Sequence, residues 1–181
     1  MYSNDIGEIL ITEKQLQERI KELGAQISKD YEDKEEFLVV GILKGSVVFL
    51  SDLIRNIDVH TKIDFMTVSS YGMGSTTTGA ITVKKDLDTD IEGKNVLIAE
   101  DIIDSGITLS NLVKLLKERN PKSIKICTLL NKPERREADI HVDYIGFDIP
   151  NEFIVGYGLD YAENYRNIPY IGVLKREVYE K

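Results

Sequence analysis

Hydrophobic positions along the chain follow two alternating patterns, one typical of helices and one typical of buried strands. Residues 12–27 predict an amphipathic helix, because the capping-box sequence Thr12-Glu-Lys-Gln15 precedes apolar residues at helical spacing. The run Phe37-Leu-Val-Val-Gly-Ile-Leu43 is too short for most helices and rich in branched residues, so it predicts a buried strand. Lys44-Gly45-Ser46 interrupts the apolar run, and residues 47–54 predict a second, buried helix.

The rest of the chain continues this alternation beyond a polar loop. Residues 61–70 and 80–86 predict two strands on either side of residues 71–79, which are rich in glycine and hydroxyl side chains. Residues 96–99 predict a short buried strand, and residues 109–116 predict the helix that follows it. The remaining strand signals lie at 123–130, 142–147, 153–157 and 171–174. Strands that alternate with helices predict an α/β fold with a mainly parallel sheet in one domain.

Composition narrows the class of protein. The chain has 181 residues, of which 42% are hydrophobic and 30% are charged, as in an ordinary globular protein. Its single cysteine, Cys127, excludes an internal disulfide and allows a reducing compartment. The first residues show no secretory signal, and no apolar stretch approaches the roughly 18 residues that a membrane span needs. We therefore expect a cytoplasmic protein with no membrane partner.

Charge argues against a protein that binds nucleic acid non-specifically. The formal net charge is −8, whereas such proteins carry a basic surface. Basic residues are nevertheless concentrated between Lys114 and Arg136, where eight Lys and Arg residues stand against two acids. This stretch is interpreted either as a solvated helix face with a loop or as a site for an anionic ligand or partner.

Candidate chemistry lies at the expected carboxyl ends of the strands, where parallel α/β sheets bind their ligands. Three polar segments reach this edge, namely residues 44–46, residues 100–108 and Lys132. Within the second, Asp104-Ser-Gly-Ile-Thr108 stands between a strand and a helix N-terminus, so free N–H groups and two hydroxyls face any phosphate placed there. The alternative is an ordinary turn with Asp104 or Ser105 as the helix N-cap.

Two adjacent acids, Glu100 and Asp101, do not suit a simple turn, because they repel each other unless cations or ribose hydroxyls engage them. Carboxylates beside a phosphate loop suggest Mg²⁺ carried in with a phosphorylated substrate. The alternative is a pair of solvated loop acids. The chain has neither a P-loop sequence nor an early G-x-G-x-x-G, and His60 and His141 lie outside these segments.

These residues resemble a known family. Val96-Leu-Ile-Ala-Glu-Asp-Ile-Ile-Asp-Ser-Gly-Ile-Thr108 resembles the phosphoribosyl-diphosphate signature of the purine phosphoribosyltransferases: an apolar strand, two acids, then D-[ST]-G-x-T. Further similarities lie in the family's diphosphate loop (Leu43-Lys-Gly-Ser46), its mobile lid (Ser70-Tyr71) and the strand carrying its purine-reading lysine (Leu129-Leu-Asn-Lys132). Phe153-Ile-Val-Gly-Tyr-Gly-Leu-Asp-Tyr161, together with Arg166, resembles the C-terminal segment of the hypoxanthine-guanine members.

The resemblance implies the type I phosphoribosyltransferase fold, a mainly parallel twisted sheet flanked by helices. It implies one domain over residues 1–181, with a small hood from about 1–12 and 150–181 and a mobile lid over about 70–79. It also implies a cis or strained Leu43–Lys44 peptide bond, and a homodimer or homotetramer.

The activity implied is purine salvage. The 5-phosphoribosyl group passes from 5-phosphoribosyl-1-diphosphate to hypoxanthine and/or guanine, giving IMP and/or GMP plus diphosphate. In this reaction Asp104 is the expected general base at purine N7. Lys132 is expected to donate a hydrogen bond to the 6-oxo group, while Phe153 and Ile103 enclose the purine ring.

Partners and cofactor also follow from the resemblance: small-molecule substrates, no nucleic acid, and Mg²⁺ held through Glu100, Asp101 and Asp160. The implied substrate-binding residues are Lys44, Gly45, Glu100, Asp101, Ile103, Asp104, Ser105, Gly106, Ile107, Thr108, Leu109, Lys132, Phe153, Ile154, Asp160 and Arg166, with Ser70 and Tyr71 in the lid.

Three alternatives remain open at this point. The first is a regulatory protein that keeps this fold but binds RNA or DNA, which the net charge disfavours. The second is a phosphorylation-switch receiver domain, whose acid pair belongs at the first strand, whereas Glu100-Asp101 comes past the middle of the chain. The third is a relative that uses xanthine or a pyrimidine, and the 153–160 segment disfavours pyrimidines more strongly than xanthine.

Overall fold

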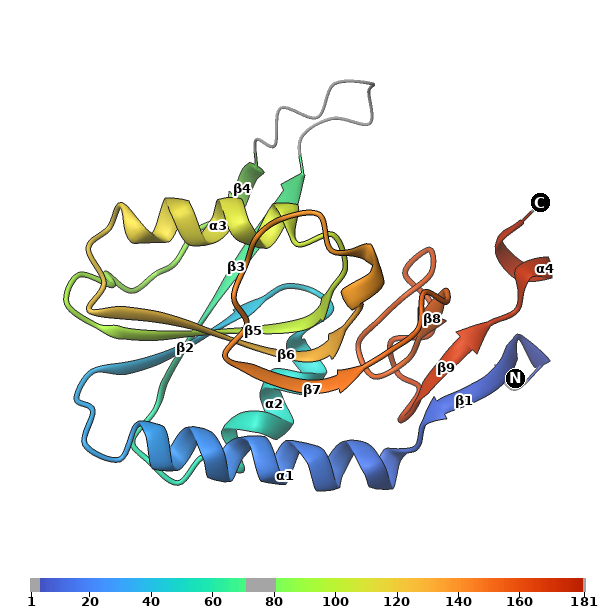
Figure 1. Ribbon diagram of the computed structural model, residues 1–181, viewed down its shortest axis with the longest axis horizontal. Helices are drawn as coiled ribbons and strands as arrows, with labels where there is room; N and C mark the ends of the chain where they lie inside the picture. Colours follow the sequence, from blue (N-terminus) through green and yellow to red (C-terminus); the bar gives the residue numbers. More distant parts are fainter. Residues whose placement is uncertain (1–3, 71–80, 181) are drawn as a thin grey trace.

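The protein is built around a six-stranded twisted sheet, seen nearly edge-on in Figure 1. The computed structural model describes residues 4–70 and 81–180. In spatial order the strands are β4 (Ile81–Lys85), β3 (Lys62–Ser70), β2 (Phe37–Ile42), β5 (Asn95–Ile103), β6 (Ser123–Asn131) and β7 (Tyr144–Asp148). All neighbouring pairs are parallel except β3 and β4, which are antiparallel. The mainly parallel α/β sheet predicted from the sequence is therefore confirmed.

Helices cover both faces of this sheet (Figure 1). Helices α1 (Glu13–Asp30) and α2 (Val47–Ile54) pack on one face, and α3 (Ile107–Lys117) packs on the other. Helix α1 begins at the predicted capping box, in which Thr12 and Gln15 exchange hydrogen bonds. Because β2 is covered on both faces, all six of its residues are buried, which explains its continuous apolar sequence. None of the described helices is long and apolar enough to cross a membrane.

A second, three-stranded sheet is formed by segments from both ends of the chain. Its antiparallel strands are β1 (Ile6–Ile11), β9 (Ile171–Leu174) and β8 (Ile154–Val155), and helix α4 (Arg176–Tyr179) follows β9. Figure 1 shows this sheet beside the end of the main sheet at which β6 and β7 finish. The small hood expected from the resemblance is thus part of the fold.

The structure differs from the predicted elements around the acid pair. Strand β5 continues to Ile103, because its pairing with β6 extends to Ile103 opposite Asn131. Glu100 and Asp101 therefore lie within a strand rather than in a loop. Helix α3 begins at Ile107, and its N-cap is Gly106 at φ 79°, not Asp104 or Ser105. Glycine suits this cap, because positive φ is unfavourable for residues with a Cβ atom.

Two expectations fall on parts of the chain outside the described residues. The predicted lid, residues 70–79, includes only Ser70 as the last residue of β3, and Tyr71 lies outside the described part. Residues 1–3 and residue 181 of the predicted hood lie outside it as well.

Candidate active site

The loop after β2 approaches the acid pair closely. The Leu43–Lys44 peptide bond is cis, as the resemblance implied. At the next residue, a Cβ atom on Gly45 would lie 1.6 Å from Oδ2 of Asp101. A side chain at position 45 would therefore displace the Asp101 carboxylate, and the two segments predicted to act together are in contact.

The Glu100–Asp101 pair is electrostatically unusual. Burial, and then repulsion from Asp101, raise the pKa of Glu100 well above its ordinary value. Burial also raises the pKa of Asp101, although the Ile102 N–H donates a hydrogen bond to its Oδ1 at 2.9 Å. Within the described part of the chain, Oε2 of Glu100 is buried without a hydrogen-bond partner. A buried, unpartnered carboxylate oxygen beside a second, partly buried carboxylate indicates a place for a cation or for hydroxyl donors.

The turn between β5 and α3 lines a hollow of about 220 Å³. Its lining residues are Glu100, Ile102, Ile103, Asp104, Ser105, Gly106, Thr108 and Leu109. The N-terminus of α3 opens this turn, and its N-cap, Gly106, has no side chain to cover the first N–H groups. The arrangement matches the predicted phosphate loop, since a helix N-terminus attracts anions through its N–H groups and dipole.

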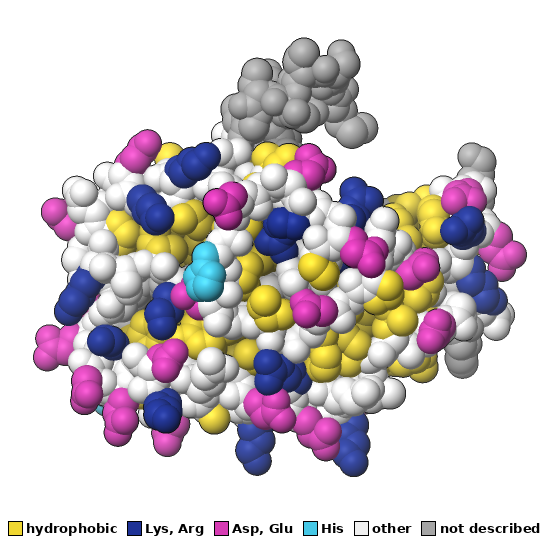
Figure 2. All heavy atoms as spheres, in the orientation of Figure 1, with side chains coloured by type: hydrophobic (Ala, Val, Ile, Leu, Met, Phe, Trp, Pro, Cys, Tyr) yellow, Lys and Arg dark blue, Asp and Glu magenta, His cyan; other side chains and the backbone are white. Residues whose placement is uncertain are grey.

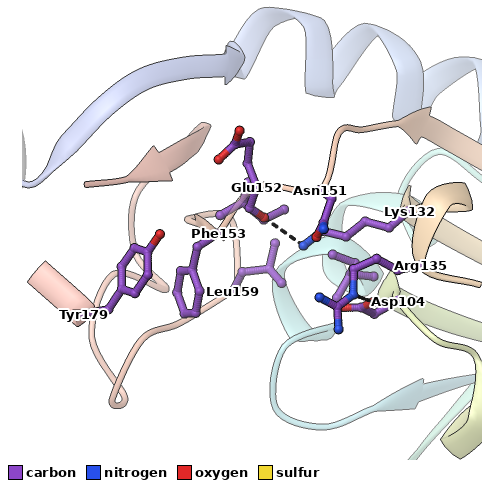
Figure 3. Close-up of a pocket in the computed structure, with 10 residues that line it drawn as sticks. Asp104, Lys132, Arg135, Asn151, Glu152, Phe153, Leu159 and Tyr179 are labelled. Carbon is purple, nitrogen blue, oxygen red and sulfur yellow. Dashed lines mark hydrogen bonds and ion pairs between the residues drawn. The ribbon is translucent and has the colours of Figure 1, made fainter. Parts of the chain in front are cut away.

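A larger cavity of about 440 Å³ lies between the end of the main sheet and the small sheet (Figure 3). It is lined by Ile102, Asp104, Lys132, Arg135, Asn151, Glu152, Phe153, Ile154, Leu159 and Tyr179. Lys132 is 7% exposed, and its Nζ donates a hydrogen bond to the Glu152 carbonyl oxygen at 2.8 Å. Burial lowers the pKa of Lys132. The wall thus combines the apolar side chains of Ile102, Ile154 and Leu159 and two aromatic rings with charged and polar groups, and this mixture suits a flat, polar-edged ring ligand.

Asp104 and its neighbour Ile102 line both hollows, and Asp104 is the charged group at the boundary of the two candidate subsites. Its Oδ1 lies 2.5 Å from Nε of Arg135, and both side chains are partly exposed. Arg135 follows the buried Lys132 by three residues in the short 3₁₀ helix η2 (Pro133–Arg135), which brings it over the carboxylate (Figure 3). The sequence analysis did not assign Arg135 to the site.

Arg166 and Asp160 belong to the loop between β8 and β9. Nη2 of Arg166 lies 2.8 Å from Oδ1 of Asp160, and Nη1 donates to the Gly158 carbonyl oxygen at 2.8 Å. From the same loop, Glu163 pairs with Lys44 at 2.9 Å. A Cβ atom on Gly158 would lie 2.1 Å from the carbonyl oxygen of Gly45, so this loop packs directly on the loop after β2.

Ile102 and Ile103, at the end of β5, lie in different surroundings. Ile103 is 2% exposed and packs in the core beneath α3, whereas its neighbour Ile102 lines the larger cavity opposite the hood. The reason is a break in the strand alternation: Ile98 and Ile103 pack in the same core although they are five residues apart. Of the other predicted apolar residues, Ile154 lines the larger cavity, Leu109 lines the smaller one, and Ile107 begins α3.

Several lining groups had no sequence signal. The small sheet folds back beside the end of β6, and only this brings four groups to the cavity: Asn151, the Glu152 carbonyl oxygen, Leu159 and Tyr179. Tyr179 lies 47 positions after Lys132 in the sequence, and no spacing rule connects them.

The basic stretch between Lys114 and Arg136 does not form one surface. Arg119 donates two hydrogen bonds to Asp86, at 2.8 and 2.9 Å, and Nζ of Lys125 lies 3.5 Å from Asp30. Lys132 instead points into the cavity. On the face drawn in Figure 2, Lys and Arg side chains are interspersed with Asp and Glu. These separate partners favour the solvated-face interpretation.

Comparison with known proteins gives consistent results. The family model of the phosphoribosyl transferase domain matches residues 8–162. A hypoxanthine-guanine phosphoribosyltransferase of Bacillus subtilis is 54% identical over 180 residues, which are 99% of each chain. One of Streptococcus pneumoniae is 55% identical over 179 residues, again 99% of each chain.

Solved structures agree with the sequence relatives. A crystal structure of a hypoxanthine phosphoribosyltransferase from Staphylococcus aureus matches with a TM-score of 0.94 and 56% identity, over 99% of this chain and 97% of that chain. The similarity covers the main sheet, the small sheet and the cavity between them. The chain therefore belongs to the phosphoribosyltransferase family.

Proposed function

We propose that this protein is a purine-salvage enzyme. It transfers 5-phosphoribosyl from 5-phosphoribosyl-1-diphosphate to hypoxanthine and/or guanine, and releases diphosphate with IMP and/or GMP. The observation that carries this proposal is that one carboxylate, Asp104, borders both a helix N-terminal turn suited to a phosphate and a cavity with a buried lysine and an aromatic ring. The names of the relatives, which share more than half of the aligned residues, support the same reaction.

The smaller hollow takes the phosphoribosyl group. The N–H groups at the start of α3 and the Thr108 hydroxyl bind the 5′-phosphate, with Ser105 and Gly106 shaping the turn. Glu100 and Asp101 accept hydrogen bonds from the ribose hydroxyls. The Lys44-Gly45 backbone and Arg166 bind the diphosphate that departs.

The larger cavity takes the purine. Lys132 donates a hydrogen bond to the 6-oxo group, Phe153 stacks on the ring, and Ile102 faces it from β5. Backbone groups near Ile154 and Asp160 bind the remaining ring atoms. Such a cavity selects 6-oxopurines, because the Lys132 ammonium and a 6-amino group are both donors and cannot pair.

The reaction replaces one bond at the ribose anomeric carbon with another. The bond to the diphosphate oxygen breaks with its electron pair on the oxygen, and the purine N9 forms the new bond. Positive charge that develops on the ribose is stabilised by Glu100 and Asp101. Asp104 accepts the proton from purine N7, so the leaving diphosphate and the neutral nucleotide base complete the balance.

Magnesium fits the carboxylates of this site. The buried and unpartnered Oε2 of Glu100, next to Asp101, provides hard oxygen donors of the kind Mg²⁺ prefers, and Asp160 offers a further carboxylate. When bound, Mg²⁺ supplies positive charge that offsets the charge of the diphosphate.

We also propose that the enzyme acts in the cytoplasm as a homodimer or homotetramer. Residues 1–181 then form one domain, with residues about 70–79 as its lid.

The direct test is a substrate panel. Product formation from 5-phosphoribosyl-1-diphosphate and Mg²⁺ is measured with hypoxanthine, guanine, xanthine and adenine in parallel. We expect efficient use of hypoxanthine and/or guanine and little use of adenine. In Lys132→Gln, we expect lower kcat/KM and weaker discrimination against adenine, while the surface control Lys122→Gln behaves like the unaltered protein. Efficient use of adenine by the unaltered protein contradicts the proposed role of Lys132.

A further inference from the structure

Three aromatic rings form a cluster at the edge of the purine cavity. Phe153 and Tyr179 are stacked, with ring centroids 4.6 Å apart and an interplanar angle of 20°. Tyr161 meets Phe153 edge-on, at 5.7 Å and 85°, and contacts Tyr179 at 6.4 Å and 65°. Both geometries are the favoured ones for aromatic pairs, so the rings restrain one another.

The backbone ties Tyr179 to Phe153. The Leu174 N–H donates a hydrogen bond to the Phe153 carbonyl oxygen at 2.8 Å, which joins β9 to the residue that carries the stacking ring. Helix α4 starts two residues later and turns through a hydrogen bond from the Val178 N–H to the Lys175 carbonyl oxygen at 3.0 Å. The Lys175 N–H in turn donates to the Asp5 carbonyl oxygen at 2.9 Å. The last turn of the chain is therefore fixed above Phe153.

The stack leaves one face of the Phe153 ring for a ligand. In Figure 3 the ring lies between Tyr179 on one side and Lys132 and Asp104 on the other. Phe153 is 38% exposed, although its other contacts are with Tyr161 and Tyr179. Phe153 and Tyr179 both line the cavity, and the face of Phe153 turned away from Tyr179 is on the side of Lys132 and Asp104 (Figure 3).

We propose that Tyr179 is a positioning residue for the purine: by stacking on the rear face of Phe153, it holds that ring in the orientation in which its front face receives the base. Tyr161 braces the same ring at its edge. This inference rests on the proposed function, since it takes the ligand of the cavity to be a purine. It adds the C-terminal turn of the chain to the groups that determine purine affinity.

Loss of the Tyr179–Phe153 stack should affect the binding of the purine and not that of 5-phosphoribosyl-1-diphosphate. An unsupported Phe153 ring samples several rotamers, and binding a purine then has to restrict it, which weakens binding. Tyr179 is not among the residues that line the phosphate-loop hollow, so binding of 5-phosphoribosyl-1-diphosphate is unaffected. The step at Asp104 is also unaffected once the purine is bound. Loss of the stack therefore raises the KM for the purine and leaves kcat and the other KM unchanged.

Three variants test this inference. We expect Tyr179→Ala to raise the KM for hypoxanthine about three- to tenfold, the range that loss of an aromatic pair predicts, with kcat and the KM for 5-phosphoribosyl-1-diphosphate within about twofold. Tyr179→Phe keeps the stack and should restore the original KM. Val178→Ala, in the same turn but outside the ring cluster, is the matched control for loosening of α4 and should leave all three constants unchanged.

The outcomes separate the inference from the proposed function. If the unaltered protein transfers phosphoribosyl to no purine, the proposed function fails. If it is active and Tyr179→Ala keeps the original KM for hypoxanthine, or raises both KM values equally, the positioning role is wrong. Should Tyr179→Ala not fold, Tyr179→Leu takes its place, because it keeps apolar bulk without the ring; a KM for hypoxanthine equal to that of Tyr179→Phe then overturns the inference.

Discussion

The position of Asp104 is set both by the local sequence and by the tertiary fold. Its place in the chain, three residues after Asp101, brings it from the buried acid pair round to the start of α3. Its place in the fold puts it on the boundary between the two hollows, where Arg135 forms an ion pair with it. Because both partners are partly exposed, this pair contributes little to stability.

At the residue scale, we predict that Asp104→Asn lowers kcat by about 10²-fold or more, the usual scale for the loss of a general base. Asparagine keeps the size of the side chain but cannot accept the N7 proton, so the KM for 5-phosphoribosyl-1-diphosphate should change little. Steady-state kinetics checks both constants. Arg135→Gln is the matched control, since it removes the ion pair and leaves the carboxylate, and its kcat should stay within a few-fold. A normal kcat with weaker substrate binding in Asp104→Asn would identify Asp104 as a structural cap of the phosphate loop.

At the element scale, the loop between β8 and β9 is held against two other parts of the fold. Gly158 has φ 102° and lies against the carbonyl oxygen of Gly45, so the loop meets the diphosphate loop. Tyr157, at φ 49°, donates a hydrogen bond from its hydroxyl to Asp52 of α2, and Gln17 of α1 donates to the same carboxylate at 2.9 Å. The hood loop is thus linked to both helices on one face of the sheet.

We predict that Gly158→Ala raises the KM for 5-phosphoribosyl-1-diphosphate at least several-fold, because the new Cβ atom displaces the Gly45 backbone. Gly93 gives a matched control, since it also has a positive φ, at 69°, but a Cβ atom there would meet nothing within 4 Å. Gly93→Ala should therefore show only the backbone penalty, about 1 kcal/mol in the free energy of unfolding, with unchanged kinetics. Equal kinetics in the two variants would show that the close approach does not matter for the site.

We predict that Tyr157→Phe lowers the free energy of unfolding by about 1.5 kcal/mol, the scale of a hydrogen bond to a charged group. Burial raises the pKa of Asp52, but hydrogen bonds from Tyr157, Gln17 and Arg55 outweigh burial and bring that pKa below its ordinary value. The stability from this network is therefore present above the ordinary carboxyl pKa of about 4 and is lost as the pH falls further.

Urea unfolding at neutral and acid pH measures this difference, and the two proteins should converge in acid. Tyr170→Phe is the control, because the Tyr170 hydroxyl has no hydrogen-bond partner in the described part of the molecule. A Tyr157→Phe effect that does not depend on pH would mean that the hydroxyl acts through packing rather than through Asp52.

At the scale of the whole molecule, positive charge is concentrated near the larger cavity rather than along one face. The chain carries a net charge of −8, yet Lys132 and Arg135 meet at the cavity, with Arg166 in the neighbouring hood loop. Arg119 and Lys125, two other basic residues of the 114–136 stretch, form ion pairs with Asp86 and Asp30, away from the cavity. Attraction for an anion is therefore local rather than spread over a face of the molecule.

We accordingly predict no salt-dependent binding of RNA. In a filter-binding or electrophoretic assay at about 50 mM salt, the protein should retain no more single-stranded or duplex RNA than an acidic control protein of similar size. Retention that falls steeply between about 50 and 200 mM salt would contradict this and revive a regulatory role, because such a slope measures lysine and arginine contacts to phosphates.

Short-range sequence patterns were enough to predict the main sheet and the family of this protein. The capping box at Thr12, the apolar run of β2 and the acid pair with its glycine-containing turn at 100–108 are contiguous in sequence, and the physics that shapes them acts over a few residues. They predicted the mainly parallel sheet, and the resemblance they carry identified the family correctly.

Tertiary structure decided what depends on contacts between distant segments. Gly45 lies against the Asp101 carboxylate, and Gly158 packs on the same loop. Tyr179 stacks on Phe153 only because β8, β9 and α4 fold back beside the main sheet. Ile102 rather than Ile103 borders the larger cavity because the alternation of side chains along β5 is broken, and no periodic pattern in the sequence encodes this break. Sequence periodicity reports which face a residue prefers, whereas the partner on that face is set by how the whole chain packs.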